Sequence, residues 1–209
     1  MTEMLNEADK ALRLPRLVLA SGSPRRAEIM NSVGWEFTKA VPDVDESVRV
    51  GEPPEDYVQR LAGEKAAAVA ASHPGEIILA ADTTVVIGGE IVGKPEDLED
   101  ARRMIRMLAG NWHEVLTGVA VARGRDVRIG MQRTRVKFVE MTDAEIDFLV
   151  EKGEPLDKAG AYAVQAQAAL FIEGIEGEYW NVVGLPISLV YRLVNGLSNT
   201  SDPSRADAA

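Results

Sequence analysis

Short apolar runs alternate with stretches of helical periodicity along most of the chain. Apolar runs bounded by turn residues predict strands, and apolar positions that recur every three or four residues predict helices. The predicted strands cover residues 16–20, 36–41, 77–81, 84–87, 90–92, 114–122, 126–139 and 168–175. The predicted helices cover residues 24–33, 54–72, 96–109, 142–151 and 186–195. This alternation predicts the α/β class.

The sheet is predicted to contain both parallel and antiparallel strands. The segment Arg123-Gly124-Arg125 joins the two long predicted strands 114–122 and 126–139 through a short turn, which is typical of a β-hairpin. Hairpin strands are antiparallel, whereas strands connected through a helix are usually parallel. The sequence therefore predicts a mixed sheet and leaves the strand order open.

Both ends of the chain lack the apolar periodicity of its middle. We expect a polar extension at residues 1–14, a single domain at residues 15–196 and a flexible tail at residues 197–209. The first 15 residues mix acids with bases and contain no apolar stretch, which argues against a signal peptide or a membrane anchor. No other segment is apolar for long enough to cross a bilayer, so we expect no membrane partner.

Charge and composition narrow the function classes. The chain has 209 residues and a formal net charge of -10 at pH 7, which opposes binding to a polyanion, so we expect no nucleic-acid partner. A small anionic substrate stays compatible if a metal and local cations offset the charge. The absence of cysteine excludes disulfides, iron–sulfur clusters and thiolate zinc sites, and it favours a cytoplasmic location.

The first predicted helix starts with charges that a helix N-terminus disfavours. Ser23 is a good N-cap and Pro24 is preorganised for the first turn. Arg25 and Arg26 follow, where the helix dipole disfavours each cation by roughly 0.3–1 kcal/mol. Free backbone N–H groups and two guanidinium groups together suit a phosphate. The alternative is a surface salt bridge to Glu28 or another carboxylate.

Two groups of carboxylates are candidate functional residues. Asp82 stands at the end of the predicted strand 77–81, between apolar runs where an unpaired carboxylate would be costly. It is a candidate magnesium ligand, a candidate base that activates water, or a structural acceptor for neighbouring amides. The acidic loop formed by Asp43, Asp45 and Glu46 offers oxygen ligands suited to magnesium or manganese, or is simply solvated.

Two lysines are candidate partners for an anion. On the predicted helix 54–72, Lys65 lies in line with an apolar stripe formed by Val58, Leu61, Ala68 and Val69. A lysine in such a stripe either extends to the solvent or meets an anion. Lys94 precedes Pro95 in a stiff loop and points either at a phosphate or at solvent.

Several other kinds of site lack support. His73 and His113, the only histidines, lack the spacing of a zinc site. Neither the P-loop motif nor the dinucleotide-binding motif occurs, which argues against a Walker-type kinase and a nicotinamide-dependent oxidoreductase. Tyr179 and Trp180 are an aromatic pair that either stacks on a base or, as is more common, packs in the core.

Five segments carry a family resemblance: L-A-S-G-S-P-R-R at residues 19–26, A-D-T at 81–83, G-K-P at 93–95, D-K-A-G-A-Y-A-V-Q at 157–165 and V-V-G-L-P at 182–186. With them the chain resembles the Maf family of nucleotide pyrophosphatases, historically called septum formation proteins, from about Leu17 to Val194. The resemblance implies an elongated, two-lobed α/β fold with a mixed sheet and a central cleft, related to inosine triphosphate pyrophosphatase. It also implies a homodimer, and the D-K-A-G-A-Y segment is similar to the subfamily that acts on dTTP and UTP.

The resemblance also implies roles for individual residues. It assigns the triphosphate to Ser21, Arg25, Arg26, Lys65 and Lys94. Asp82 would accept a proton, and Glu46 and Asp82 would hold a divalent metal, magnesium or manganese. Substrate choice would rest on Thr83, Arg25 and Gln165. One departure concerns the segment after Gln165, where Ala166 and Ala168 replace two glycines of the family pattern, at a cost of roughly 1 kcal/mol wherever the backbone needs a positive φ.

The sequence therefore predicts an enzyme that hydrolyses nucleoside triphosphates to the monophosphate and pyrophosphate. Water oriented by Asp82 and a metal would attack the α-phosphorus, and four cations would stabilise the charge on the leaving pyrophosphate. Two alternatives stay open. One is a house-cleaning pyrophosphatase for modified or non-pyrimidine nucleotides, and the other is a non-catalytic nucleotide-binding regulator of cell division.

Overall fold

The computed structural model describes residues 13–199 and is built on one seven-stranded mixed sheet. Its strands run in the order β2-β1-β3-β5-β6-β7, and β4 pairs with β3 beside this path. Their bounds are β1 Leu17–Ala20, β2 Phe37–Ala40, β3 Ile77–Ile87, β4 Glu90–Val92, β5 Trp112–Arg123, β6 Asp126–Phe138 and β7 Ile172–Glu176. Strand β1 is parallel to β2 and β3, and the other pairs are antiparallel. The predicted mixed sheet and the β5–β6 hairpin are confirmed.

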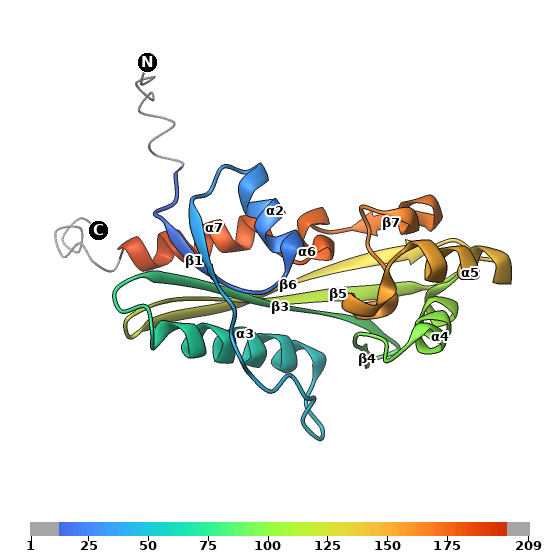
Figure 1. The fold of residues 1–209 in the computed structure, drawn as a ribbon, viewed down its shortest axis with the longest axis horizontal. Helices are drawn as coiled ribbons and strands as arrows, with labels where there is room; N and C mark the ends of the chain where they lie inside the picture. Colours follow the sequence, from blue (N-terminus) through green and yellow to red (C-terminus); the bar gives the residue numbers. More distant parts are fainter. Residues whose placement is uncertain (1–12, 200–209) are drawn as a thin grey trace, which may run out of the picture.

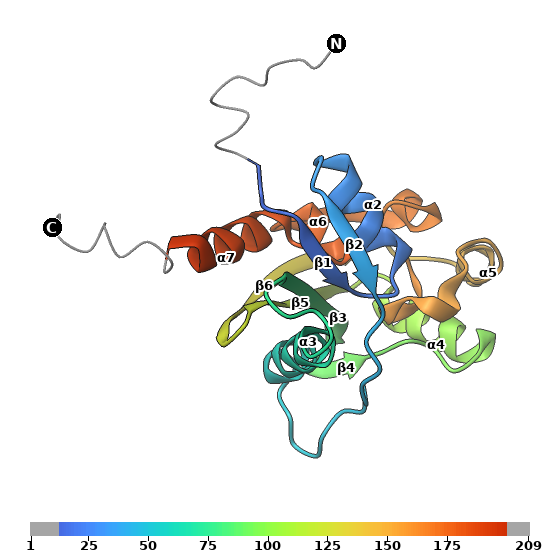
Figure 2. The same cartoon turned by 60° about the vertical axis from the view of Figure 1, so that its left-hand side comes forward.

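Helices cover both faces of the sheet near β1 (Figures 1 and 2). The α-helices are α2 Pro24–Ser32, α3 Pro54–Ala70, α4 Leu98–Leu108, α5 Asp143–Lys152, α6 Tyr179–Val183 and α7 Ile187–Asn199. Alternate side chains of β1 point to opposite faces. Leu17 and Leu19 pack with α2 and α7, whereas Val18 and Ala20 pack with α3. Strand β1 therefore reads as a continuous apolar run because it is buried on both sides.

The far half of the sheet carries a second core. Buried side chains of α4 and α5 pack there with the 3-10 turns η2 (Ala159–Ala161) and η3 (Gln167–Phe171). The long strands β3, β5 and β6 connect the two halves into the elongated shape seen in Figure 1. The predicted two-lobed α/β fold is thereby confirmed.

One strand prediction is wrong at a functional position. The segments 77–81 and 84–87 form a single strand, β3, so Asp82 lies in its middle rather than at an end. The strand continues because the backbone of Asp82 pairs with Gly118 of β5. A Cβ atom on Gly118 would lie 2.1 Å from the carbonyl oxygen of Val58, so the missing side chain lets α3 approach the sheet closely. This approach brings Lys65 of α3 within reach of the Asp82 carboxylate.

The C-terminal third also differs from the prediction. The predicted strand 168–175 begins four residues too early: β7 covers Ile172–Glu176, because the preceding η3 turns inward and buries Ala168 and Phe171. Helix α6 was not predicted, since its five residues are too short to show a period. Helix α7 extends to Asn199, with Leu197 buried against the core. Residues 1–12 and 200–209, which include most of both predicted extensions, lie outside the described residues.

Across residues 13–199, none of the helices combines the length and the apolar character needed to traverse a bilayer.

Candidate active site

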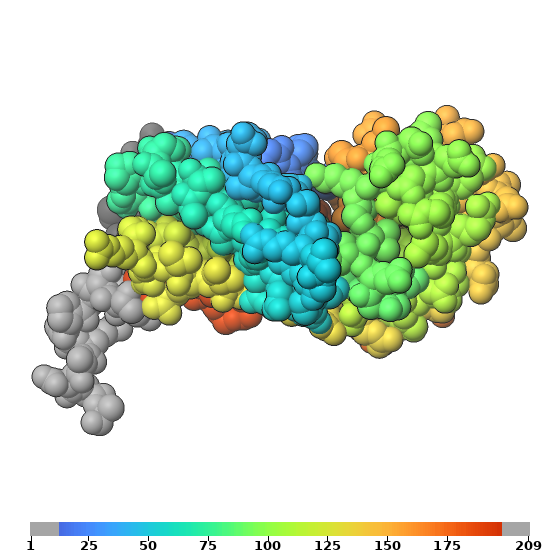
Figure 3. Space-filling view, turned by 90° about the horizontal axis from the view of Figure 1, so that it is seen from below, coloured from blue at the N-terminus to red at the C-terminus, as the bar shows by residue number. Residues whose placement is uncertain are grey.

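A cavity of about 980 Å³ lies between the two halves of the molecule. Figure 3 shows the surface hollowed where the blue and cyan segments meet the green ones. All nine residues that the family resemblance assigns to the site line this cavity: Ser21, Arg25, Arg26, Glu46, Lys65, Asp82, Thr83, Lys94 and Gln165. The fold thus brings together residues that are up to 144 positions apart, from Ser21 to Gln165 (165 minus 21).

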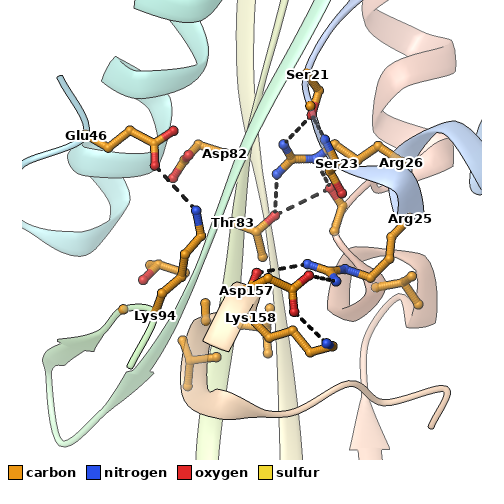
Figure 4. Close-up of a pocket in the computed structure, with 18 of the residues that line it drawn as sticks. Ser21, Ser23, Arg25, Arg26, Glu46, Asp82, Thr83, Lys94, Asp157 and Lys158 are labelled. Carbon is orange, nitrogen blue, oxygen red and sulfur yellow. Dashed lines mark hydrogen bonds and ion pairs between the residues drawn. The ribbon is translucent and has the colours of Figure 1, made fainter. Parts of the chain in front are cut away.

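Arg26 is held in place by neutral oxygens. Its guanidinium group donates to the Gly184 carbonyl at 2.9 Å, to Ser21 Oγ at 3.1 Å and to Thr83 Oγ1 at 3.2 Å (Figure 4). Burial lowers the pKa of Arg26 below its ordinary value, and the charge of Asp82 opposes this shift. A partly desolvated cation with neutral acceptors at a helix N-terminus is well suited to an anionic ligand.

Arg25 is paired instead with a carboxylate. Its Nη1 lies 2.7 Å from Asp157 Oδ2, and its Nη2 donates to the Asp157 carbonyl at 3.2 Å. The surface salt bridge considered as an alternative thus exists for Arg25, with Asp157 rather than with Glu28. The two neighbouring arginines therefore have different electrostatic environments.

A lysine and two carboxylates form the opposite wall of the cavity. Lys65 Nζ lies 2.6 Å from Asp82 Oδ1 and 2.6 Å from Glu46 Oε1. Lys65 and Asp82 are buried, at 6% and 7% exposure, so the pair compensates two charges that would otherwise be costly. Lys94 is more exposed, and its Nζ lies 3.7 Å from Glu46 Oε2.

The loop that carries Glu46 has no regular secondary structure and is fixed by side chains of α3. Tyr57 Oη donates to the Glu46 carbonyl at 3.0 Å. Arg60 binds both oxygens of Glu52, at 2.5 and 2.7 Å, and the Ser47 carbonyl at 3.1 Å. The hydrogen bonds from Arg60 lower the pKa of Glu52 from 4.5 to about 2, so this anchor also stays charged in mildly acidic solution. Of the predicted acidic loop, Glu46 reaches the cavity, whereas Asp43 and Asp45 are not among its lining residues.

Thr83 connects the cavity to a buried polar network. Its Oγ1 lies 2.9 Å from Thr117 Oγ1, and Thr117 donates to the Asn181 carbonyl at 3.2 Å. Asn181 is fully buried and donates to the Val115 carbonyl and to Thr134 Oγ1. Sequence reasoning missed Thr117 and Asn181. A hydroxyl in the apolar run 114–122 was the one available signal for Thr117.

Asp157 and Lys158 are further polar residues at the cavity whose roles were not predicted. They begin the motif D-K-A-G-A-Y-A-V-Q, so the sequence marked these two residues as part of a family pattern but assigned them no chemical role. Lys158 Nζ lies 2.6 Å from Asp157 Oδ1 and donates to the Glu154 carbonyl. Asp157 therefore binds two cations at once.

The alanines after Gln165 do not strain the backbone. Ala166 has a φ of -117°, and among the described residues Glu154 and Ala161 are the non-glycine residues with positive φ. The glycine positions of the family pattern are thus compatible with alanine in this loop. Gln165 itself is exposed to the cavity.

Tyr179 and Trp180 do not line the cavity, and Trp180 packs against the core beside α7. Core packing is thus the interpretation that the structure supports for Trp180, whereas Tyr179 is 40% exposed.

Because His113 is buried, we expect the free energy of unfolding to depend on pH. Its Nε2 lies 2.7 Å from the hydroxyl of Tyr162, a residue that lines the cavity, and burial lowers the pKa of His113 from 6.5 to about 4. Below pH 6.5 the unfolded state takes up a proton that the folded state resists until about pH 4. The stability present above pH 6.5 is therefore lost as the pH falls, by about 2 kcal/mol between pH 6.5 and 5.

Urea denaturation of the parent and of His113→Gln, at closely spaced pH values, measures this contribution. The variant is expected to show a shallower loss of unfolding free energy over that pH interval. Equal slopes for both proteins would contradict the assignment.

The site offers a divalent cation two carboxylates rather than a complete protein cage. Glu46 and Asp82 converge on Lys65, and within residues 13–199 no group of three or more His, Cys, Asp or Glu side chains could hold a metal ion. Partial burial raises the pKa of Glu46, but its interactions with Lys65 outweigh this effect, so the net pKa lies below its ordinary value. Magnesium commonly binds one or two carboxylates together with substrate phosphates. The residues present fit that mode.

Fold and site together define a class of protein: a mixed-sheet α/β protein whose cleft is lined by arginines, lysines and carboxylates. Residues 16–197 match the family of Maf-like proteins, and the chain belongs to this family.

Two known proteins of similar sequence share one name. The chain is 54% identical over 179 residues to the dTTP/UTP pyrophosphatase of Anaeromyxobacter dehalogenans (strain 2CP-C), which covers 83% of this chain and 90% of that protein. It is 50% identical over 175 residues to the dTTP/UTP pyrophosphatase of Hahella chejuensis (strain KCTC 2396), covering 82% and 87% of the two chains. The solved structure of the Staphylococcus aureus Ham1 protein matches with a TM-score of 0.52 and 15% identity over 88% of this chain and 100% of that chain, which supports the predicted fold.

Proposed function

We propose that the protein hydrolyses nucleoside triphosphates, dTTP and UTP foremost, to the nucleoside monophosphate and pyrophosphate. One observation carries the proposal: a single cleft joins the Arg26 anion site to the Asp82–Lys65–Glu46 cluster in a chain half identical to dTTP/UTP pyrophosphatases. One water molecule enters, the bond between the α-phosphorus and its bridging oxygen breaks, and pyrophosphate leaves.

We assign different roles to the residues of the cleft. Ser21, Arg26, Lys65 and Lys94 bind the phosphates, with Arg26 as the anchor because it has no carboxylate partner at hydrogen-bond distance among the described residues. Asp82 orients the attacking water and accepts its proton. The cations stabilise the charge that develops on the departing pyrophosphate, and in a partly buried cleft this stabilisation is stronger than in water.

A divalent cation, magnesium or manganese, is part of the proposal. Glu46 and Asp82 would hold it, and it would neutralise phosphate oxygens when bound. Lys65 contacts both carboxylates, and Arg60 fixes the loop from Glu46 to Glu52. These contacts keep the carboxylates of Glu46 and Asp82 near each other without the metal.

Substrate choice is assigned to Thr83, Arg25 and Gln165, which all line the cleft. A neutral amide such as Gln165 can pair with the edge of a pyrimidine. A homodimer and a cytoplasmic location complete the proposal. Size-exclusion chromatography with light scattering measures the oligomeric state directly.

The function has a direct test. Purified protein is incubated with each common nucleoside triphosphate and with magnesium or manganese, and the first phosphorus-containing product is identified. Pyrophosphate from UTP and dTTP is expected, with kcat/KM at least about 10-fold higher than for CTP. Chelation of the metal is expected to stop the reaction, and excess magnesium to restore it.

Each alternative function has its own outcome in this test. Orthophosphate as the first product would contradict the cleavage position. Faster turnover of modified or purine nucleotides would favour the house-cleaning activity. Nucleotide binding without any product would favour the non-catalytic regulator.

A further inference from the structure

The two arginines at the start of α2 face different partners, and this difference bears on how the substrate is recognised. Arg26 donates to neutral oxygens of Ser21, Thr83 and Gly184, whereas the Arg25 charge is offset by Asp157 at 2.7 Å. A phosphate chain gains more from the cation to which, in the part of the chain that the structure describes, no carboxylate is hydrogen-bonded. Arg25 is therefore the arginine left for a less charged part of the ligand.

The Arg25–Asp157 pair also crosses the cleft. Arg25 belongs to α2, which packs on the core with β1 and α7, whereas Asp157 ends η1 (Pro155–Asp157), which contacts α4 in the other half. Figure 4 draws Arg25, Asp157 and Lys158 as one group and Glu46, Asp82 and Lys94 as another. Gln165 lines the cleft from the same C-terminal segment as Asp157. The pair thus lies apart from the acidic cluster that is assigned to the chemistry.

Asp157 is well suited to fix the direction of the guanidinium group. It accepts from Nη1 with its carboxylate and from Nη2 with its carbonyl, and its second carboxylate oxygen is held by Lys158. Burial would raise the pKa of Asp157, but the hydrogen bonds from Lys158 and Arg25 lower it below its ordinary value, so the carboxylate stays charged. Two of the five N–H groups of the guanidinium are used, and three remain to donate to a ligand.

We propose that Asp157 is a positioning residue for base selection: it holds Arg25 so that the free N–H donors face a carbonyl oxygen of the pyrimidine. This inference rests on the proposed function. Uracil and thymine present a carbonyl oxygen at the ring position where cytosine carries an amino group. Fixed N–H donors of Arg25 can donate to the carbonyl oxygen of uracil or thymine. Facing the amino group of cytosine they have no acceptor, which penalises binding of the wrong base.

The test compares the kcat/KM values for UTP and CTP in Asp157→Asn, in Asp157→Glu and in the parent. Asp157→Asn removes the charge that holds Arg25, and we expect the UTP/CTP ratio to fall at least 10-fold. Asp157→Glu keeps a carboxylate and is expected to restore part of the ratio. The matched control is Asp143→Asn, which breaks a 2.6 Å ion pair with Arg106 on the exposed surface and is expected to leave the ratio unchanged.

Other outcomes overturn the inference. If Asp157→Asn lowers KM for UTP and CTP alike, Asp157 merely competes with phosphate for Arg25. If it reduces both kcat/KM values equally, its role is structural. If Asp157→Asn does not fold, Arg25→Lys tests the same point, because lysine keeps the charge but lacks the planar row of guanidinium donors. An unchanged UTP/CTP ratio in Arg25→Lys rejects the proposal. A parent that turns over neither UTP nor dTTP would instead reject the proposed function.

Discussion

Asp82→Asn is expected to lower kcat for UTP by about 10²- to 10⁴-fold, the usual contribution of a positioned general base. Asparagine keeps the shape of the side chain and removes the charge that accepts the proton. The fold is expected to tolerate the change because Lys65 Nζ keeps its 2.6 Å contact with Glu46. The loss of unfolding free energy should therefore stay below the roughly 3–5 kcal/mol that is typical when a buried ion is left unpaired.

Two measurements distinguish the roles open to Asp82. If it accepts the proton, saturating magnesium leaves the kcat of the variant low. If it serves chiefly as a metal ligand, the magnesium concentration needed for half-maximal activity rises and excess metal recovers most of the rate. Turnover within a few-fold of the parent, with an unchanged urea midpoint, would show that Asp82 does neither.

Four of the nine predicted cleft residues could be singled out from the sequence because each violates a local rule: Arg25, Arg26, Lys65 and Asp82. Lys65 interrupts an apolar stripe, and the structure shows the anions that compensate it. Asp82 interrupts an apolar run, and the prediction that the strand ends there was wrong. In the sequence, a polar residue that ends a strand cannot be distinguished from a carboxylate that is paired inside one. The long-range contact between Gly118 and Val58, which lets the strand and helix approach, has no local signature.

Pairing between distant segments was the part that the sequence could not predict. Arg25 and Arg26 are adjacent and chemically identical, and their difference arises from Asp157, which lies 132 residues after Arg25. Thr117 and Asn181 are linked across 64 positions through a backbone carbonyl. The turn η3 buries Ala168 and Phe171 in the second core, and the short helix α6 packs against both cores, so neither element has a periodicity that the sequence could show.

Arg26→Gln is expected to lower kcat/KM for UTP by about 10²- to 10³-fold and to weaken the binding of inorganic pyrophosphate about 10²-fold. A hydrogen bond from a charged group contributes roughly 1.5–3 kcal/mol, so the loss of one or two such bonds to phosphate gives changes of this size. Arg26→Lys keeps the charge without the three-way hydrogen bonding and should fall between the variant and the parent.

The contrast with Arg25 makes this expectation specific to the position. Since Asp157 already offsets the charge of Arg25, Arg25→Gln should leave the calorimetric affinity for inorganic pyrophosphate within about threefold of the parent. Arg103→Gln removes an exposed arginine paired with Asp100 at 2.7 Å and controls for the change in net charge. If Arg25→Gln and Arg26→Gln weakened pyrophosphate binding equally, both arginines would hold phosphate, and Asp157 would have to release Arg25 whenever the substrate binds.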